Sequence, residues 1–301
     1  MKSILMLLFL VFTLSAKNLT VNDVYAKTEI IEQHLHFLLK YYNVKHNHLE
    51  KKHIIISSKL KPRNSWQKAY ELLVKINRLR LSHELLRIEP IGMEPVENLT
   101  IGMLYGMVDR VLTEIIIFEH RKGLIPPTFK LHKGTNKNLL DIYNILSLLS
   151  LAFDELNGST ISSAYIYAET MRIYDDLTII LNHLHISDNT IPNRRLKDAT
   201  IKDATNSSFK LLTNIIRLHR IVGISSIQCT EFNKVTPEAR DLYNIVGLIV
   251  AELQPLKAHL GLTKNITPSA LSYENKTPAD IEQLMSWNFR KLELIKSLER
   301  R

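Results

Sequence analysis

Cysteine, glycine and proline are scarce in this sequence of 301 residues, and each scarcity excludes a class of protein. The single cysteine, Cys229, leaves no partner for an internal disulfide and excludes a zinc finger built on several cysteines. Only 9 Gly and 10 Pro argue against a turn-rich β-sandwich or barrel. Hydrophobic residues at 45% and charged residues at 23% are ordinary for a packed globular protein, so a disordered or collagen-like chain is excluded.

Known catalytic and cofactor motifs are missing from the sequence as well. It contains no G-x-S-x-G, no phosphate-binding glycine loop, no H-E-x-x-H and no dinucleotide-binding glycine turn. It also lacks an EF-hand loop, a pair of Glu-x-x-His helices and a nucleic-acid-binding motif. We therefore predict a protein that is not an enzyme, has no cofactor and binds no nucleic acid.

The N-terminus has the three-part layout of a secretory signal peptide. Lys2 supplies the positive charge, residues 4–14 are apolar except for one threonine, and Ala16 offers a small residue for cleavage. An apolar run of this length rises only about 16 Å as a helix, roughly half of a bilayer core, so we do not expect it to span a membrane. We predict that residues 1–16 are a signal peptide. An uncleaved anchor is the alternative, because Leu14 stands where a small residue is preferred.

Composition and charge also bear on the compartment. A richness in Lys, Asn and Ile, together with export and the lack of disulfides, favours a bacterial periplasm. The formal net charge is +9, with dense basic segments at 59–63 and 194–197. These segments could attract anionic lipid headgroups or polysaccharide of the envelope. Solubility is the alternative explanation of the charge.

Four segments of the first half recur in the same order about 139 residues later, which predicts an internal duplication. The expected domains are two tandem copies of a four-helix unit, at 17–158 and 159–301. Two of the matched pairs are 70–79 with 209–218 and 104–124 with 242–262.

The matched segments carry apolar residues at i, i+3, i+4 and i+7, the spacing of helices with one buried face. We expect Thr236 and Thr277 to be N-caps followed by proline, Asn64-Ser65 and Asn206-Ser207 to cap the second helix of each copy, and Pro255 to kink or shorten its helix. Four glycines are expected to end helices: Gly123, Gly158, Gly223 and Gly261. The only β-like segment is 53–57. The prediction is an all-α chain with helices near 22–43, 64–88, 97–122, 137–157, 161–185, 203–222, 237–261 and 278–299.

Three pairs of polar residues occupy matching places in the two copies and are the candidate ligand-binding residues. They are Arg78 with Arg217, Tyr105 with Tyr243, and Glu114 with Glu252. The two arginines could bind a carboxylate or phosphate ligand with paired hydrogen bonds. Alternatively, they form ion pairs with the two glutamates, which would make them structural.

An Asp-x-Tyr pattern recurs near three expected helix starts: Asp23-Val-Tyr25, Asp141-Ile-Tyr143 and Asp241-Leu-Tyr243. One interpretation is an acidic residue in the first turn, where it meets the positive end of the helix dipole, followed by a core aromatic. The other is a ring of tyrosine hydroxyls that lines a small-molecule cleft between helices.

Histidines cluster in the expected connector after the first helix. His46, Glu50 and His53, with His48 between them, would share a face if this piece were helical, and imidazole with carboxylate can bind zinc, copper or nickel. The alternative is a solvated connector whose lysines repel a cation. The second copy has no such cluster.

Together these observations predict an exported helical binding or interaction module that senses a ligand and reports to a membrane partner. Its expected partners are a protein, such as a membrane sensor, and a small-molecule or anionic envelope ligand. The alternatives are a metal-binding protein that uses the histidine cluster and a structural protein held on anionic surfaces of the envelope.

Overall fold

The structure is a computed structural model that describes residues 19–44, 56–57, 59–88, 99–131, 134–158, 161–229, 236–268 and 270–297. The prediction of an all-α chain is confirmed, since these residues form eight helices and one ladder of two short strands. The predicted signal peptide at 1–16 lies outside the described residues. The helices are α2 (Val21–Tyr41), α3 (Pro62–Ser82), α4 (Ile101–Arg121), α5 (Leu139–Leu156), α6 (Ser163–His183), α7 (Ile201–Ile221), α8 (Ala239–His259) and α9 (Pro278–Ser297).

Helix starts are set by acidic residues at the third helical position. Their carboxylates accept a hydrogen bond from the backbone N–H of the residue just before the helix. Asp23, Asp141 and Asp241 do so in α2, α5 and α8, at 2.7–3.0 Å. This confirms the acidic first-turn residue of the first interpretation of the Asp-x-Tyr pattern. The following tyrosine is buried in two cases, Tyr143 and Tyr243, and half-buried in the third, Tyr25. Thr277 caps α9 as predicted, through Asp280.

Two of the predicted caps, Thr236 and Asn206-Ser207, are wrong because a better capping arrangement lies elsewhere. The helix expected after Thr236 begins after Glu238, since the Asp241 side chain accepts from the N–H of Glu238. The predicted caps Asn64-Ser65 and Asn206-Ser207 lie inside α3 and α7, which begin after Lys61 and Thr200. Asn64 nevertheless caps α3 as predicted, since its Oδ1 accepts from the N–H of Lys61 at 2.8 Å. In α7, Thr200 and Asp203 form a capping box.

Helix ends follow the predicted glycines. Gly123, Gly158, Gly223 and Gly261 have φ of 68° to 77°, the left-handed conformation that closes a helix and that glycine adopts without strain. Pro255 lies inside α8, which continues to His259, so the proline does not shorten its helix.

The second predicted helix, 64–88, is too long by one and a half turns. Helix α3 ends at Ser82, and Glu84 has a φ of 61°. The chain then folds back, because the N–H of Ile88 donates to the side chain of Asn77 at 2.8 Å. A polar side chain in the helix thus captures the following segment, which helical periodicity alone does not reveal.

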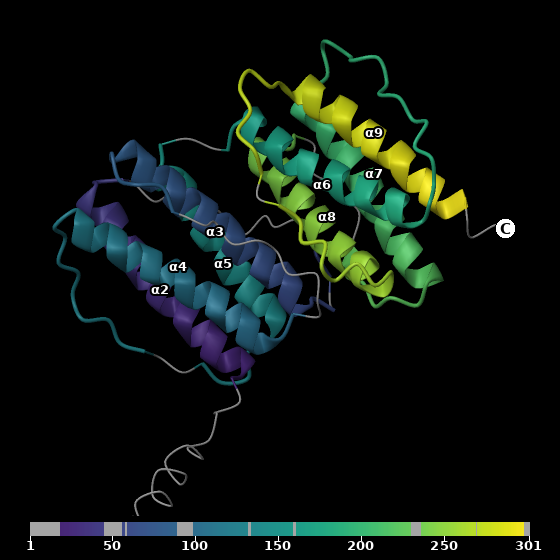
Figure 1. Cartoon of the computed structure of the whole chain (residues 1–301). Helices are drawn as coiled ribbons and strands as arrows, with labels where there is room; N and C mark the ends of the chain where they lie inside the picture. Colours follow the sequence, from purple (N-terminus) through teal and green to yellow (C-terminus); the bar gives the residue numbers. More distant parts are fainter. Residues whose placement is uncertain are drawn as a thin grey trace, which may run out of the picture.

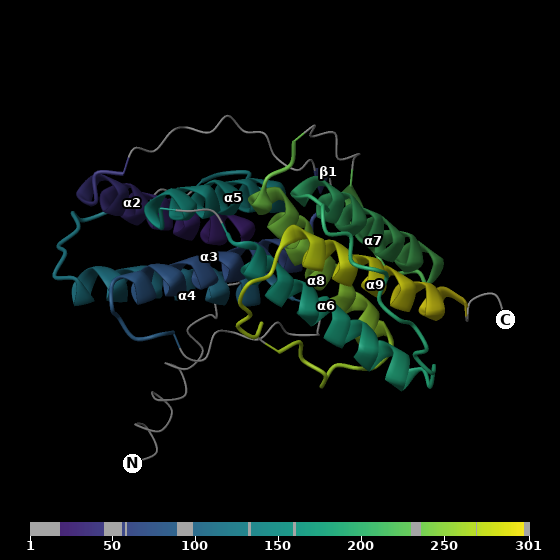
Figure 2. The ribbon, with the colours of Figure 1, turned by 90° about the horizontal axis from the view of Figure 1, so that it is seen from above.

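The helices form two four-helix bundles, which lie side by side in Figures 1 and 2. We call α2–α5 the first unit and α6–α9 the second unit. In the first, α2 and α3 each pack on α4 and α5; in the second, α6 and α7 each pack on α8 and α9. The order of neighbours is the same in both units, as expected of tandem copies, while the duplication itself stays a prediction.

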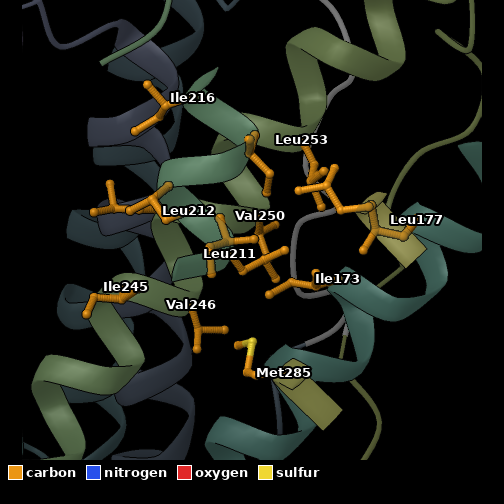
Figure 3. Packing of buried hydrophobic residues seen from close by; sticks show 14 of the residues in the cluster. Ile173, Leu177, Leu211, Leu212, Ile216, Ile245, Val246, Val250, Leu253 and Met285 are labelled. Carbon is orange, nitrogen blue, oxygen red and sulfur yellow. The ribbon is translucent and has the colours of Figure 1, made fainter. Parts of the chain in front are cut away.

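Each unit has its own apolar core. Figure 3 shows that of the second unit, where Ile173 and Leu177 from α6 meet Val246 and Leu253 from α8. All four side chains are fully buried. Burial of such a side chain contributes roughly 1.5–3 kcal/mol, so the packing of these stripes holds each bundle together.

Buried polar pairs occupy matching places in the two units, with the acid on α4 in the first unit and on α6 in the second. Between α2 and α4, His34 Nδ1 lies 2.8 Å from Glu119 Oε2. Between α6 and α8, Lys257 Nζ lies 2.7 Å from Asp176 Oδ1. Glu119 and Lys257 are 138 residues apart, and His34 and Asp176 are 142 apart, the offsets at which these helices match in sequence. Each place therefore holds a polar pair, without a fixed choice of residue.

The two units meet where α3 of the first packs on α8 of the second. Nearby, strand β1 (Ile56–Ser57) pairs antiparallel with strand β2 (Gln228–Cys229). We call this contact region the seam. The end of the β-like segment 53–57 is thus a strand, and its partner was not predicted because two residues carry no alternating pattern.

Candidate ligand site at the seam

A stripe of polar and charged residues runs along α3 at the seam. Asn64, Lys68, Glu71 and Lys75 follow one another at i, i+4, i+7 and i+11, and each is 5% exposed or less. They are buried because α3 lies between the rest of its own unit and α8 of the other unit. Charged groups are rarely buried to this extent unless they are paired, so their contacts decide what the seam can do.

Glu71 is the centre of this stripe. Its Oε2 accepts from Lys68 Nζ at 2.6 Å, its Oε1 lies 3.1 Å from Lys75 Nζ, and it also accepts from the hydroxyl of Ser150 on α5. Burial alone would raise the pKa of Glu71, but the two lysines outweigh it and lower the pKa to about 2. Glu71 is therefore a permanent anion at physiological pH.

Asp154 of α5 shares the charge of Lys75 with Glu71. Lys75 Nζ donates to Asp154 Oδ2 at 2.8 Å, while the buried Oδ1 has no hydrogen-bond partner among the described residues. Burial raises the pKa of Asp154, more than Lys75 lowers it. Burial also lowers the pKa of Lys68, against the pull of Glu71. The stripe is thus held by a network of charges that balance one another, with one unsatisfied acceptor.

Side chains of the stripe also reach across the seam. Asn64 Nδ2 donates to Glu252 Oε1 of α8 at 2.9 Å, and Lys68 Nζ donates to Asn244 Oδ1 of α8. Beside these contacts is a cavity of about 10 Å³, close to the least volume that holds one water molecule. At this point the two units are therefore joined by hydrogen bonds between polar side chains and not by apolar packing.

Two of the three tyrosines of the Asp-x-Tyr pattern, Tyr143 and Tyr243, line this small cavity. Burial raises the pKa of both, so both hydroxyls stay protonated. The Tyr243 hydroxyl is buried without a partner among the described residues, and the carboxylates of Glu169 and Glu71 add to the rise of its pKa. The third tyrosine, Tyr25, lies under the ammonium of Lys137, 4.2 Å from its ring centre.

A larger cleft, of about 310 Å³, opens at the junction of the units. This volume is within the range of small-molecule sites. One wall comes from α3 and the segment after it, and the other from α6 and residues 270–273 of the connector before α9. The lining residues are Tyr70, Val74, Asn77, Leu81 and Arg87 of the first unit and Ser162, Ala164, Tyr165, Ala168, Glu169, Ala270, Leu271, Ser272 and Tyr273 of the second.

One of the residues that line this cleft is a buried carboxylate, Glu169. Glu169 is 2% exposed, and its Oε2 accepts from Arg172 Nη1 at 2.7 Å. The Arg172 guanidinium lies 5.2 Å from the ring centre of Tyr70, so it stacks between the two units. Arg172 Nε also donates to the carbonyl of Pro268 at 2.9 Å, which holds the connector before α9 in place.

Of the six candidate ligand-binding residues, the structure brings Tyr243 and Glu252 to the seam. Arg78, Arg217, Tyr105 and Glu114 line neither the small cavity nor the cleft. Tyr105 lies under the ammonium of Lys27, 5.0 Å from its ring centre, and Arg217 is exposed on α7.

The two predicted glutamates, Glu114 and Glu252, contact other bases on the same two helices as the predicted arginines. Glu114 binds Arg80 at 2.5 Å, and Glu252 lies 3.5 Å from His219 Nδ1. Arg78 and Arg217 stand two positions earlier, which places them about 200° around the helix from these partners. Each predicted glutamate therefore contacts the residue two positions after the predicted arginine.

The other predicted sites give no second candidate. His46, Glu50 and His53 lie outside the described residues. Within the described part of the chain, no group of three or more His, Cys, Asp or Glu residues is placed to hold a metal ion. A search of the same part of the chain finds no helix with the length and apolar character needed to cross a membrane.

Part of the basic segments 59–63 and 194–197 is buried or paired within the protein. Arg63 is 7% exposed in α3, and Arg195 Nε donates to Asp280 Oδ1 at 2.7 Å.

Cys229 lies in β2, where burial and the nearby Glu252 raise the pKa of its thiol to about 12. The thiol is therefore protonated at neutral pH and a poor nucleophile.

The sequence carries one pattern that indicates this site. Trp66, Tyr70 and Val74 repeat at i, i+4 and i+8, outside the stripe that contains Leu72 and Ile76. A second apolar stripe on one helix indicates a second buried face.

Comparison of the chain with protein-family models, curated proteins and solved structures finds no match.

Proposed function

We propose that the chain is an exported helical binding module that holds a small molecule in the cleft between its two units and reports it to a protein partner in the periplasm. The cleft of about 310 Å³ carries the proposal, because its walls come from both units and combine apolar, aromatic and charged side chains. The absence of a catalytic motif in the sequence supports binding over catalysis.

The position of the cleft supports a sensing role. A ligand that touches Tyr70 and Asn77 on one side and Tyr165 and Glu169 on the other binds best to one arrangement of the two units. Such a ligand shifts the population toward that arrangement, by no more than its difference in affinity for the two. The polar contacts of the seam suit this role, since polar contacts between units can be exchanged for contacts with water.

The binding part of the proposal is tested by filling the cleft. Purified protein is incubated with the small-molecule fraction of an envelope extract and examined by native mass spectrometry. We expect the unaltered chain and the control Ala258→Trp, a half-buried alanine of α8 outside the cleft lining, to retain a compound. Ala164→Trp fills the cleft and should abolish retention. Equal retention by Ala164→Trp would refute the cleft as the site.

Export is tested on the producing cells. Fractionation with N-terminal sequencing should find the chain outside the cytoplasm and beginning at Lys17. A cytoplasmic chain that retains residues 1–16 would contradict the proposed location. It would also redirect the search for a partner to the cytoplasm.

A further inference from the structure

Helix α7, which lies at the edge of the second unit in Figure 2, carries a row of exposed cations. Four of its basic residues are exposed, namely Lys202, Lys210, Arg217 and Arg220. Among the side chains that the structure describes, no other helix has more than one exposed Lys or Arg. Successive residues of an α-helix are turned by about 100°, so the four cations lie within about 80° of one another around the axis. We call these four residues the α7 row.

The charge of the α7 row is not cancelled on the helix itself. The positions between its cations on the same side are neutral, Asn206 and Thr213. Within the described residues, none of the four cations forms a salt bridge. Asp203 is the one acid of α7, and its carboxylate accepts from the N–H of Thr200 in the N-cap at 2.8 Å. Asp203 also attracts Lys202, so the row keeps its full charge at the other three cations.

Lys210, in the middle of the row, is held in place without being neutralised. Its ammonium lies 4.3 Å from the ring centre of Phe289 on α9. An aromatic face attracts a cation through its quadrupole and has no net charge to cancel it. Lys210 therefore presents its charge from a fixed position, and an anion that binds there costs less conformational freedom than on a free lysine.

The shape of the α7 row matches a linear polyanion. Its cations stand in single file over about 27 Å of helix, with about 12 Å from Lys202 to Lys210 and about 10 Å from Lys210 to Arg217. A membrane surface is a poorer match, because a helix that lies on a membrane also has a broad apolar face. On α7 the exposed large apolar side chain is Ile221 alone, at the last position.

The neutral residues between the cations suit the hydroxyl groups of a sugar chain. Asn206 is exposed, and its amide offers both donors and an acceptor. The Thr213 hydroxyl donates to the carbonyl of Lys210 at 2.9 Å, which leaves its oxygen to accept from a ligand. A single-stranded nucleic acid is a poorer match, because its bases stack on exposed aromatic rings. The ring of Phe289, beside the row, is covered by Lys210.

We propose that α7 binds a linear acidic polysaccharide, with the carboxylate or sulfate groups on the α7 row and sugar hydroxyls on Asn206 and Thr213. The site is separate from the cleft and goes beyond the proposed function. It also gives Arg217, a candidate anion-binding residue from the sequence, a ligand outside the chain. Guanidinium groups such as that of Arg217 match carboxylate and sulfate oxygens with paired hydrogen bonds.

The test measures binding of the full chain to immobilised polygalacturonate and heparin over a salt series, with neutral dextran as the blank. We expect binding to at least one of the two acidic polysaccharides and none to dextran. Affinity should fall steeply with salt, because each cation that meets an anion releases counterions. Lack of binding to both acidic chains, or binding that ignores salt, would overturn the proposal.

Two charge-matched sets of substitutions locate the site. The first replaces the four cations of the α7 row by glutamine; the control replaces four exposed cations elsewhere, Lys40, Arg121, Lys122 and Lys264. Both sets change the net charge equally and lie on the surface, so neither should alter the fold. We expect the first to weaken binding at low salt by about 100-fold, since each fully charged cation contributes about fivefold. Its salt slope should also fall by about three.

Equal losses in the two sets would show that net charge alone drives binding, which would overturn the site on α7. Duplex DNA and vesicles of anionic lipid are measured in parallel on the same proteins. If either binds more tightly than both polysaccharides and depends on the α7 row, the ligand class is wrong. None of these measurements involves the cleft, so their failure leaves the proposed function standing, and Ala164→Trp should bind polysaccharide as the unaltered chain does.

Discussion

Replacing Glu71 by glutamine should remove the centre of the buried charge network of α3. The pKa of Glu71 lies at about 2 instead of 4.5, because Lys68 and Lys75 favour its charged form. This difference corresponds to about 3 kcal/mol of folding free energy. At pH 7 the variant leaves both lysines to Asp154 alone. We therefore expect Glu71→Gln to destabilise the first unit by about 3 kcal/mol.

The sign of the pH dependence follows from the lowered pKa. A carboxyl whose folded pKa lies below its unfolded value contributes stability above the unfolded pKa, and this is lost as the pH falls through the folded one. The difference between the unaltered chain and Glu71→Gln should therefore be full above pH 5 and shrink between pH 4.5 and 2. Asp154, whose pKa is raised chiefly by burial, has the opposite dependence, and the variant reduces it because the charge of Glu71 adds to that rise.

The assay is urea unfolding at several pH values, followed by the fluorescence of Trp66 in a Trp287→Phe background. Trp66 is buried on the same helix as Glu71, so its fluorescence follows the first unit. Glu274→Gln, at an exposed glutamate of the connector before α9, is the control and should stay within about 0.5 kcal/mol. A difference that stays constant from pH 7 down to pH 2, or one no larger than in the control, would refute the reasoning.

Three further predictions concern other parts of the protein. Asp176→Ala leaves Lys257 as a fully buried unpaired charge and should cost about 3–5 kcal/mol in urea unfolding, while Asp176→Leu combined with Lys257→Met should recover most of it; equal losses would contradict the role of the pair. Gly261→Ala places a side chain at a φ of 77° and should cost about 1–2 kcal/mol by thermal unfolding, whereas a neutral effect would show that the helix end can rearrange. The Cys229 thiol, with its pKa raised from 9.0 to about 12, should react with a disulfide reagent at pH 7 about a thousandfold more slowly in the folded chain than in urea, and comparable rates would show that it is accessible and ionised.

The pairing of the two units is uneven, which explains the polar character of the seam. Helix α3 corresponds in position to α7, and 139 residues after Lys68, Glu71 and Lys75 the second unit has Ser207, Lys210 and Asn214, none of them buried. The same face is therefore at the surface in one unit and covered in the other. Covering it requires charges that pair with one another, as they do around Glu71.

The sequence by itself determined the helices, their apolar faces and their division into two sets of four. These features depend on local chemistry, because periodicity, capping carboxylates such as Asp141 and glycines such as Gly123 act within a few residues of the chain. Errors occurred where a distant side chain intervened, as when Asn77 captures Ile88 after the end of α3.

Only the tertiary structure decided which polar residues meet. Whether Lys68 is on the surface or buried depends on α8, which lies some 170 residues later in the chain. The cleft likewise combines Tyr70 and Arg87 with Glu169 and Tyr273, four residues that no spacing in the sequence connects. A helical pattern specifies which face is buried within one bundle. The face that a second bundle covers is set by the packing of whole helices against one another.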